Sequence, residues 1–260
     1  MHAVEKNTNR PSSSEPNHPM SSSKFATICG SPGARVRFMG FFFIFWPFLI
    51  VLLFAGWLFH CAFPVAIARS VSGILLFLLA AVAWIAFSSA EKRFGSFLKG
   101  ARGEEMVARE LSLLPSGWDV FHGIARNGLE VLAGGSDFDH IVIGPDTMFV
   151  IETKNWQGPV TLEHGALRVR GQVPRRSPVA QVRREAMELA AILKDAMPEG
   201  IVVTPVICFA GDGFVPEEGR IDDVSICNAR MIRNIIMETA GGQIDEQHRR
   251  LIIEALTRRV

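Results

Sequence analysis

Two carboxylates and a lysine, Asp139, Glu152 and Lys154, stand in two apolar segments whose composition is typical of paired β-strands. If the turn between the strands is centred on Pro145 and Asp146, Asp139 faces Glu152, with Cβ atoms roughly 4.5–5.5 Å apart. Two carboxylates this close repel each other unless a cation lies between them. Hard oxygen ligands of this kind suit Mg²⁺ or Mn²⁺. The hairpin therefore predicts a divalent-metal site.

The alternation of side chains along a strand places Lys154 on the same face as Glu152. A lysine beside a bound dication is suited to stabilising charge that develops on a phosphate during hydrolysis. Asp137 shares the face of Asp139 and is a rival ligand. A loop longer or shorter by one residue would turn one carboxylate to the opposite face, so the prediction depends on the register.

Around these residues the chain resembles the nuclease-related domain family, NERD, a branch of the PD-(D/E)xK nuclease-like superfamily. The resemblance covers residues 100–211, in three separated segments that occur in the family's order: GARGEEMVARELSLLP, FDHIVIGPDTMFVIETKNW and SPVAQVRREAMEL. It implies a restriction-endonuclease-like fold and nuclease-type activity. The family pattern has the Asp directly before a His, which favours Asp139 over Asp137 as the site residue.

The first of these segments predicts an amphipathic helix that begins near Gly103. Glu104 and Glu105 lie in its first turn, where the helix dipole stabilises a carboxylate in any case. The resemblance aligns the family's Gly-Glu with Gly103 and Glu104, and so implies that Glu104 faces the site and joins the metal ligands. Glu105 is the less favoured alternative.

A second amphipathic helix is predicted over residues 178–193, with Val182, Met187, Ala190 and Leu193 buried. Gln181 lies in its first turns and matches the family's glutamine. The resemblance implies that Gln181 bonds to a phosphate or to Lys154, and an ordinary surface glutamine is the alternative.

Basic side chains gather between the hairpin and this helix, in a second predicted hairpin and the segment that follows it. A local basic patch of this kind suits phosphate contact, although charges on an edge strand also discourage aggregation. The net charge of the whole chain is only +1, so any attraction to nucleic acid must be local. The candidate substrate-binding residues are Arg168, Arg170, Arg175 and Arg176.

The amino-terminal third of the chain has a different composition. Residues 1–34 are rich in Ser, Pro and Asn, which predicts a disordered tail. Two charge-free apolar runs, 38–59 and 71–88, have lengths that predict a transmembrane hairpin, assigned to 35–90 as a whole. Residues 91–102 are expected to be a basic linker. More basic residues flank the hairpin than lie in its loop, which predicts an inner (plasma) membrane location with both termini cytoplasmic.

The sequence thus predicts an α/β (α+β) fold, with a mixed sheet of about four to six strands flanked by two main helices. The nuclease-like domain would occupy residues 103–211, and a strand and helices at 212–260 would complete it. Two functions of different class are expected: a metal-dependent nuclease that acts on DNA or RNA, anchored in the lipid bilayer, or a non-catalytic nucleic-acid- or protein-binding module that keeps the fold. The clustered acidic ligands favour the nuclease, because such a cluster repels phosphate when the metal is absent.

Overall fold

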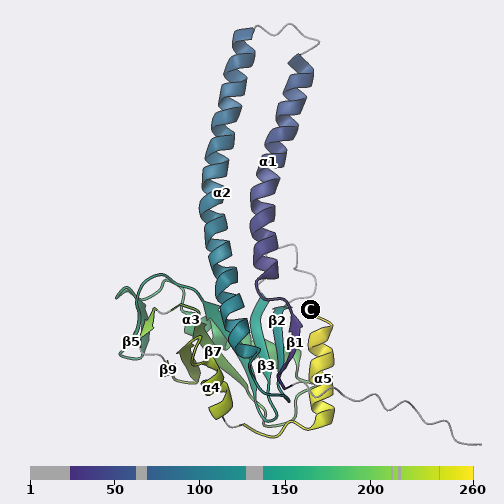
Figure 1. The fold of residues 1–260 in the computed structure, drawn as a ribbon, viewed down its shortest axis with the longest axis vertical. Helices are drawn as coiled ribbons and strands as arrows, with labels where there is room; N and C mark the ends of the chain where they lie inside the picture. Colours follow the sequence, from purple (N-terminus) through teal and green to yellow (C-terminus); the bar gives the residue numbers. More distant parts are fainter. Residues whose placement is uncertain are drawn as a thin grey trace, which may run out of the picture.

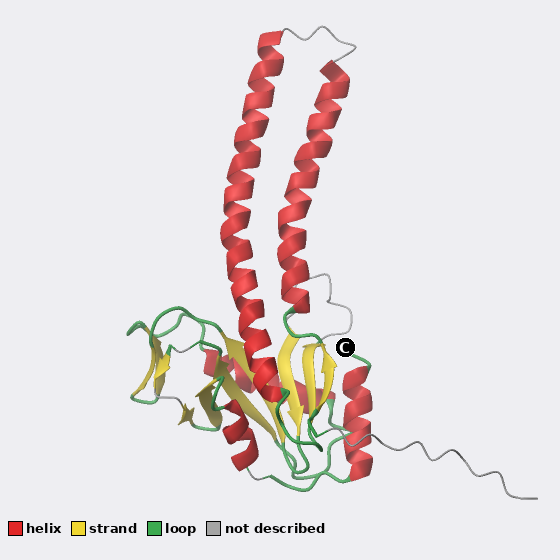
Figure 2. Ribbon diagram, viewed as in Figure 1, coloured by secondary structure: helices red, strands yellow, loops and turns green. Residues whose placement is uncertain are grey.

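The structure is a computed structural model that describes residues 24–62, 69–126, 137–211, 213–215, 218–239 and 241–259. A seven-stranded mixed sheet with helices on both faces forms its body, and two long helices project from one end (Figures 1 and 2). The expected fold class, a mixed sheet flanked by helices, is confirmed. The sheet has more strands than expected because the segments before and after the predicted domain also contribute strands.

The main sheet contains, in spatial order, β1 (Thr27–Gly30), β2 (Asp119–Ala125), β3 (Asp137–Ile143), β4 (Met148–Lys154), β7 (Val203–Phe209), β10 (Val224–Asn228) and β9 (Glu218–Ile221). The β2–β3, β3–β4 and β10–β9 pairs are antiparallel, and the other three pairs are parallel. A smaller sheet contains β6 (Ala166–Val169), β5 (Val160–Glu163) and β8 (Phe214–Val215).

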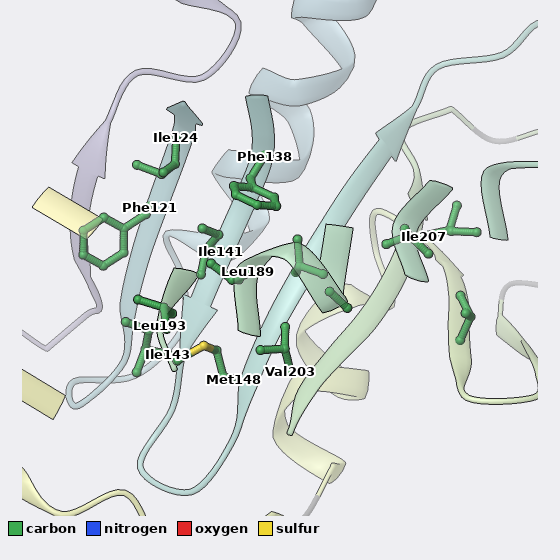
Figure 3. Packing of buried hydrophobic residues seen from close by; sticks show 14 of the residues in the cluster. Phe121, Ile124, Phe138, Ile141, Ile143, Met148, Leu189, Leu193, Val203 and Ile207 are labelled. Carbon is green, nitrogen blue, oxygen red and sulfur yellow. The ribbon is translucent and has the colours of Figure 1, made fainter. Parts of the chain in front are cut away.

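The helices of the described residues are α1 (Ala34–Ala62), α2 (Arg69–Leu111), α3 (Pro178–Ile192), α4 (Ile232–Glu238) and α5 (Glu246–Thr257). Side chains of α3 and α5 share one hydrophobic cluster with one face of the main sheet. The carboxyl-terminal end of α2 and α4 share a second cluster with the other face. Figure 3 shows Leu189 of α3, and Leu193 just beyond it, packed against Ile141 and Ile143 of β3.

The predicted register of the β3–β4 hairpin is confirmed. The backbone N–H of Gly144 donates to the carbonyl of Thr147 over 2.8 Å and closes the turn. The last pair of the ladder at the open end is His140 with Ile151. Continued by one residue, the same register sets Asp139 opposite Glu152. Opposed side chains in an antiparallel pair point to the same face, so the two carboxylates share one face of the sheet.

The prediction of a disordered tail over residues 1–34 is wrong in its last part, and residues 1–23 lie outside the described residues. β1 joins the edge of the main sheet, parallel to β2. Its last residue, Gly30, has φ of 85° and a Cβ there would lie 2.2 Å from the carbonyl oxygen of His122, so only glycine fits. β1 is four residues long, and its partner strand lies about ninety positions away, which leaves little local signal in the sequence.

Residues 38–59 and 71–88 are helical, as predicted, and lie within α1 and α2. Their predicted role as membrane spans is not supported, because within the described residues no helix combines the length and the apolar content that crossing a bilayer requires. Residues 63–68 of the connecting segment lie outside the described residues. The predicted linker 91–102 is helical and belongs to α2, consistent with its helix-forming composition and its lack of proline.

Candidate functional site

The candidate site lies on the α3 face of the sheet, where β4 ends beside the start of β3. The backbone N–H of Thr153 donates to Oδ2 of Asp139 over 2.8 Å, which fixes this carboxylate against β4. Glu152 is 5% exposed, whereas Asp139 and Lys154 are partly exposed. The structure therefore brings together the three hairpin residues that the sequence singled out, and two of them are partly exposed.

Lys154 is held between two oxygen acceptors. Its ammonium group forms an ion pair with Oε1 of Glu152 and donates to Oε1 of Gln181 over 3.0 Å. The backbone N–H of Ala210 donates to the carbonyl of Lys154 over 3.0 Å, which ties the end of β4 to β7. The predicted bond between Gln181 and the lysine is therefore present, and it joins α3 to the sheet.

Glu104 reaches the site from α2. Its Oε2 accepts a hydrogen bond of 2.8 Å from the backbone N–H of Gly33, and Glu105 is exposed. Gly103 permits this approach, because a Cβ there would lie 2.8 Å from the Cβ of Asn155, just beyond β4. The side-chain amide of Asn155 donates to the carbonyl of Lys99 over 2.7 Å and holds the helix at this distance.

The carboxylates of the site lie close enough to one another to shift the pKa of Asp139. Burial raises the pKa of Asp139 well above its usual range, and the carboxylates of Glu152 and then Glu104 raise it further. The Thr153 N–H bond and Lys154 oppose this shift. Negative charge placed this closely in a partly dry site favours a proton or a cation. Asp137, the rival ligand, lies at the start of β3, paired with Ala125.

Sequence reasoning missed Glu185. Its side chain on α3 is 1% exposed, and its Oε1 accepts from Nε2 of Gln181 over 3.0 Å and from Arg126 over 3.3 Å. Burial, followed by the nearby carboxylate of Glu152, raises the pKa of Glu185 to about 8. Its spacing of four residues from Gln181 was the available signal, since such residues share a helix face. Met187, which was expected to be buried, is exposed instead.

Two buried histidines, His122 of β2 and His140 of β3, are paired across neighbouring strands. Nδ1 of His122 and Nδ1 of His140 are 2.7 Å apart, and Nε2 of His140 is 3.1 Å from the hydroxyl of Thr153. One ring must donate and the other accept, so at least one histidine is neutral on the shared nitrogen. His140 thus contacts the hydroxyl of Thr153, and the backbone N–H of the same residue donates to Asp139.

The candidate substrate-binding arginines are not part of the carboxylate cluster, which consists of Glu104, Asp139 and Glu152. Nε of Arg168 lies 3.5 Å from Oε2 of Glu163 on the neighbouring strand, and Nε of Arg170 donates to the carbonyl of Gln157 over 3.2 Å. Arg175 and Arg176 are exposed in the segment that leads into α3.

The donors of the site are carboxylate oxygens, which fit Mg²⁺ or Mn²⁺ better than a soft metal. In the described part of the chain, no three Asp, Glu, His or Cys side chains are arranged as a complete metal-binding group. Mg²⁺ commonly takes only one or two protein carboxylates and completes its shell with water and phosphate oxygens. Asp139 and Glu152 would supply such a pair, and the carboxylate of Glu104 also raises the pKa of Asp139.

Comparison with known families found that residues 99–210 match the nuclease-related domain, NERD. The match contains the end of α2, the β3–β4 hairpin, α3 and β7, and thus every residue of the carboxylate cluster. Comparisons with curated proteins and with solved structures gave no match. Residues 99–210 of this chain are therefore a nuclease-related domain of the NERD family.

Proposed function

We propose that this chain is a metal-dependent nuclease that hydrolyses phosphodiester bonds in DNA or RNA. One observation carries the proposal: Asp139, Glu152, Lys154 and Gln181 converge at the open end of one hairpin, inside a nuclease-related domain. A purely structural role does not require two crowded carboxylates beside a lysine, because burying them is costly.

In the proposed reaction, Asp139 and Glu152 would hold Mg²⁺ or Mn²⁺, and Glu104 would add a further carboxylate. The bound metal would polarise the scissile phosphate and lower the pKa of the attacking water. Lys154 leaves its ion pair with Glu152 and donates to the charge that develops on the phosphate oxygens. Gln181 keeps the ammonium group directed toward the site through its 3.0 Å bond.

The substrate would reach the site past the exposed arginines before α3. Arg175 and Arg176, which are exposed, would contact phosphates without taking part in the chemistry. Contacts of this kind bind nucleic acid without regard to sequence, and the affinity falls steeply as salt is added. The proposed substrate class is therefore a nucleic-acid backbone rather than a particular base sequence.

A second candidate function is a non-catalytic module that binds nucleic acid or protein. The ion pair between Lys154 and Glu152 favours it, because this pair satisfies Glu152 without a metal. The two candidates differ in what Asp139 does: the nuclease needs its negative charge, and a binding module does not.

The deciding experiment uses the purified full chain with labelled single- and double-stranded DNA and RNA, in Mg²⁺, in Mn²⁺ or in EDTA. Wild type should cleave at least one substrate in a metal-dependent way. Asp139→Asn should be inactive, and the matched control Asp195→Asn, at an exposed position after α3, should cleave like wild type. Binding without cleavage by wild type would favour the non-catalytic module, and equal cleavage by Asp139→Asn would refute the proposed site.

The predicted inner (plasma) membrane location, with both termini cytoplasmic, stays a prediction. Fractionation of cells that express the full chain tests it directly.

A further inference from the structure

The side chain of Gln181 is bonded at both of its ends. Its Oε1 accepts from Nζ of Lys154 and its Nε2 donates to Oε1 of Glu185, each over 3.0 Å. A glutamine amide has nearly the same shape when its oxygen and nitrogen are exchanged, so packing alone does not orient it. The bonding partners must decide which end faces the lysine.

The chemistry of the two partners admits one orientation. The ammonium group of Lys154 only donates, so it requires the amide oxygen. Oε1 of Glu185 accepts from the opposite end and therefore fixes the amide nitrogen there. In the exchanged orientation, the amide N–H groups would face the ammonium group and the amide oxygen would face Oε1 of Glu185. The contact with the ammonium group would then be repulsive.

Glu185 is itself held in place by Arg126, the last described residue after β2. The guanidinium group of Arg126 lies 3.3 Å from Oε1 of Glu185, donates to Oε2 of Glu188 over 2.7 Å, and stacks 5.5 Å from the ring centroid of Phe138. The side chains of Arg126 and Glu185 are 10% and 1% exposed. A buried ion pair of this kind has few alternative positions, so Oε1 of Glu185 keeps a fixed position for its hydrogen bond with Gln181.

We propose that Glu185 is a positioning residue of the candidate site, which orients the Gln181 amide and thereby directs the Lys154 ammonium group. This inference rests on the proposed nuclease function and deepens it, because it extends the working site from the hairpin to a buried network on α3. Glu185 does not touch the substrate. Its loss should therefore lower kcat and leave KM nearly unchanged, whereas loss of a substrate contact would raise KM.

Two conservative variants separate the reach of Oε1 from the ability of Glu185 to ionise. Glu185→Asp keeps a titratable carboxyl group beside Arg126 but withdraws the acceptor by about one C–C bond, ~1.5 Å. Glu185→Gln keeps the reach of Oε1 but cannot ionise. Positioning predicts that Glu185→Asp lowers kcat roughly 10- to 100-fold, as expected for a displacement of about 1 Å, and that Glu185→Gln stays within about threefold of wild type. A role that depends only on ionisation of the carboxyl group predicts the reverse order.

Glu199→Gln is the matched control, because Glu199 is exposed beyond α3 and lies outside this network. It should cleave like wild type. The double variant Gln181→Ala/Glu185→Asp should cleave no more slowly than Gln181→Ala alone, since Glu185 is proposed to act only through Gln181. Independent, multiplying losses in kcat, or a Glu185→Asp variant as active as wild type, would overturn the inference while the proposed function stood.

A measurement without substrate keeps the two proposals distinguishable. If wild type cleaves none of the labelled nucleic acids, the proposed function fails. The hydrogen bond is then tested by urea unfolding of the same full-length variants. Non-additive shifts of the unfolding midpoint for Gln181→Ala and Glu185→Asp support the coupled pair, and additive shifts overturn it.

Discussion

Nζ of Lys154 donates to Oε1 of Gln181 over 3.0 Å, which links the end of β4 to the first turns of α3. The two residues are twenty-seven positions apart, and the small β5–β6 hairpin lies between them in the sequence. The proposed catalytic group is therefore positioned jointly by the sheet and by a helix packed on it. Variants of either element should affect the same step.

The first prediction concerns Lys154→Ala. Removing the ammonium group should lower kcat by about 10²–10³-fold, the loss typical of one donor to a transition-state charge. The site carboxylates remain, so stabilisation by Mg²⁺ or Mn²⁺ should persist in thermal melting. Lys194→Ala, at an exposed position beyond α3, is the control and should cleave like wild type. Undiminished cleavage by Lys154→Ala would remove this residue from the mechanism.

The second prediction concerns Asp139→Asn without and with metal. Burial, followed by the carboxylates of Glu152 and Glu104, holds the pKa of Asp139 high and favours its neutral form, so a neutral amide should leave the metal-free protein at least as stable as wild type. In wild type, metal at about one hundred times its Kd should add ~2.7 kcal/mol to the free energy of unfolding.

This metal-linked gain should disappear in Asp139→Asn and remain in the control Asp195→Asn. Thermal melting of the full chain with EDTA, Mg²⁺ and Mn²⁺ measures both effects. An equal metal-dependent shift in Asp139→Asn and wild type would show that the metal binds elsewhere.

The third prediction concerns acid stability and His122. Burial lowers the pKa of His122 from 6.5 to about 4, so its neutral form is favoured in the folded protein. As the pH falls from 6.5 toward 4, His122 is protonated more readily in the unfolded chain than in the folded protein. The free energy of unfolding therefore falls over this range and is unaffected by His122 above pH 6.5. The loss amounts to about 3 kcal/mol. Urea unfolding between pH 7.5 and 4 should show the decline.

His122→Gln, which keeps hydrogen-bonding capacity but does not titrate, should flatten this decline in part. Some decline should remain, because burial still lowers the pKa of His140 in this variant. The exposed His164 is the control. His164→Asn should decline like wild type, since asparagine tolerates the left-handed backbone found there. An unchanged decline in His122→Gln would contradict the prediction.

The fourth prediction compares two glycines of α2. A Cβ at Gly103 would lie 2.8 Å from the Cβ of Asn155 and 3.3 Å from that of Ala210, whereas a Cβ at Gly95 meets nothing within 4 Å. Gly103→Ala should therefore reduce the free energy of unfolding by roughly 1–3 kcal/mol despite the better helix propensity of alanine. Gly95→Ala should raise it by about 0.5–1 kcal/mol.

Thermal unfolding of both variants measures this difference in sign. Because Gly103 adjoins Glu104, Gly103→Ala should also weaken the metal-linked stabilisation. A stabilised Gly103→Ala variant would mean that α2 does not approach the sheet as closely as the structure indicates.

The β3–β4 hairpin was predictable because its signals are local. A Gly-Pro-Asp turn between two apolar strands sets the register, and the register sets which side chains share a face. The helical segments at 104–111 and 178–192 were predictable for the same reason, since their apolar positions repeat with the helical period. The matched family residues Glu104 and Gln181 lie in these segments.

Other features depended on packing between distant segments. β1 is too short to be recognised without its partner β2, and Glu185 appears in the sequence as an ordinary charged residue of an amphipathic helix. Its burial depends on Arg126, which lies fifty-nine positions away and reaches it only once α3 is packed on the sheet.

The sequence by itself determined the β3–β4 hairpin, its register and the residue types at the candidate site, because backbone sterics and side-chain alternation act over a few residues. The tertiary structure decided which groups hold those residues in place. Hydrogen bonds and ion pairs in a buried site depend on the relative positions of β2, β4, α2 and α3, and no short stretch of sequence specifies those positions.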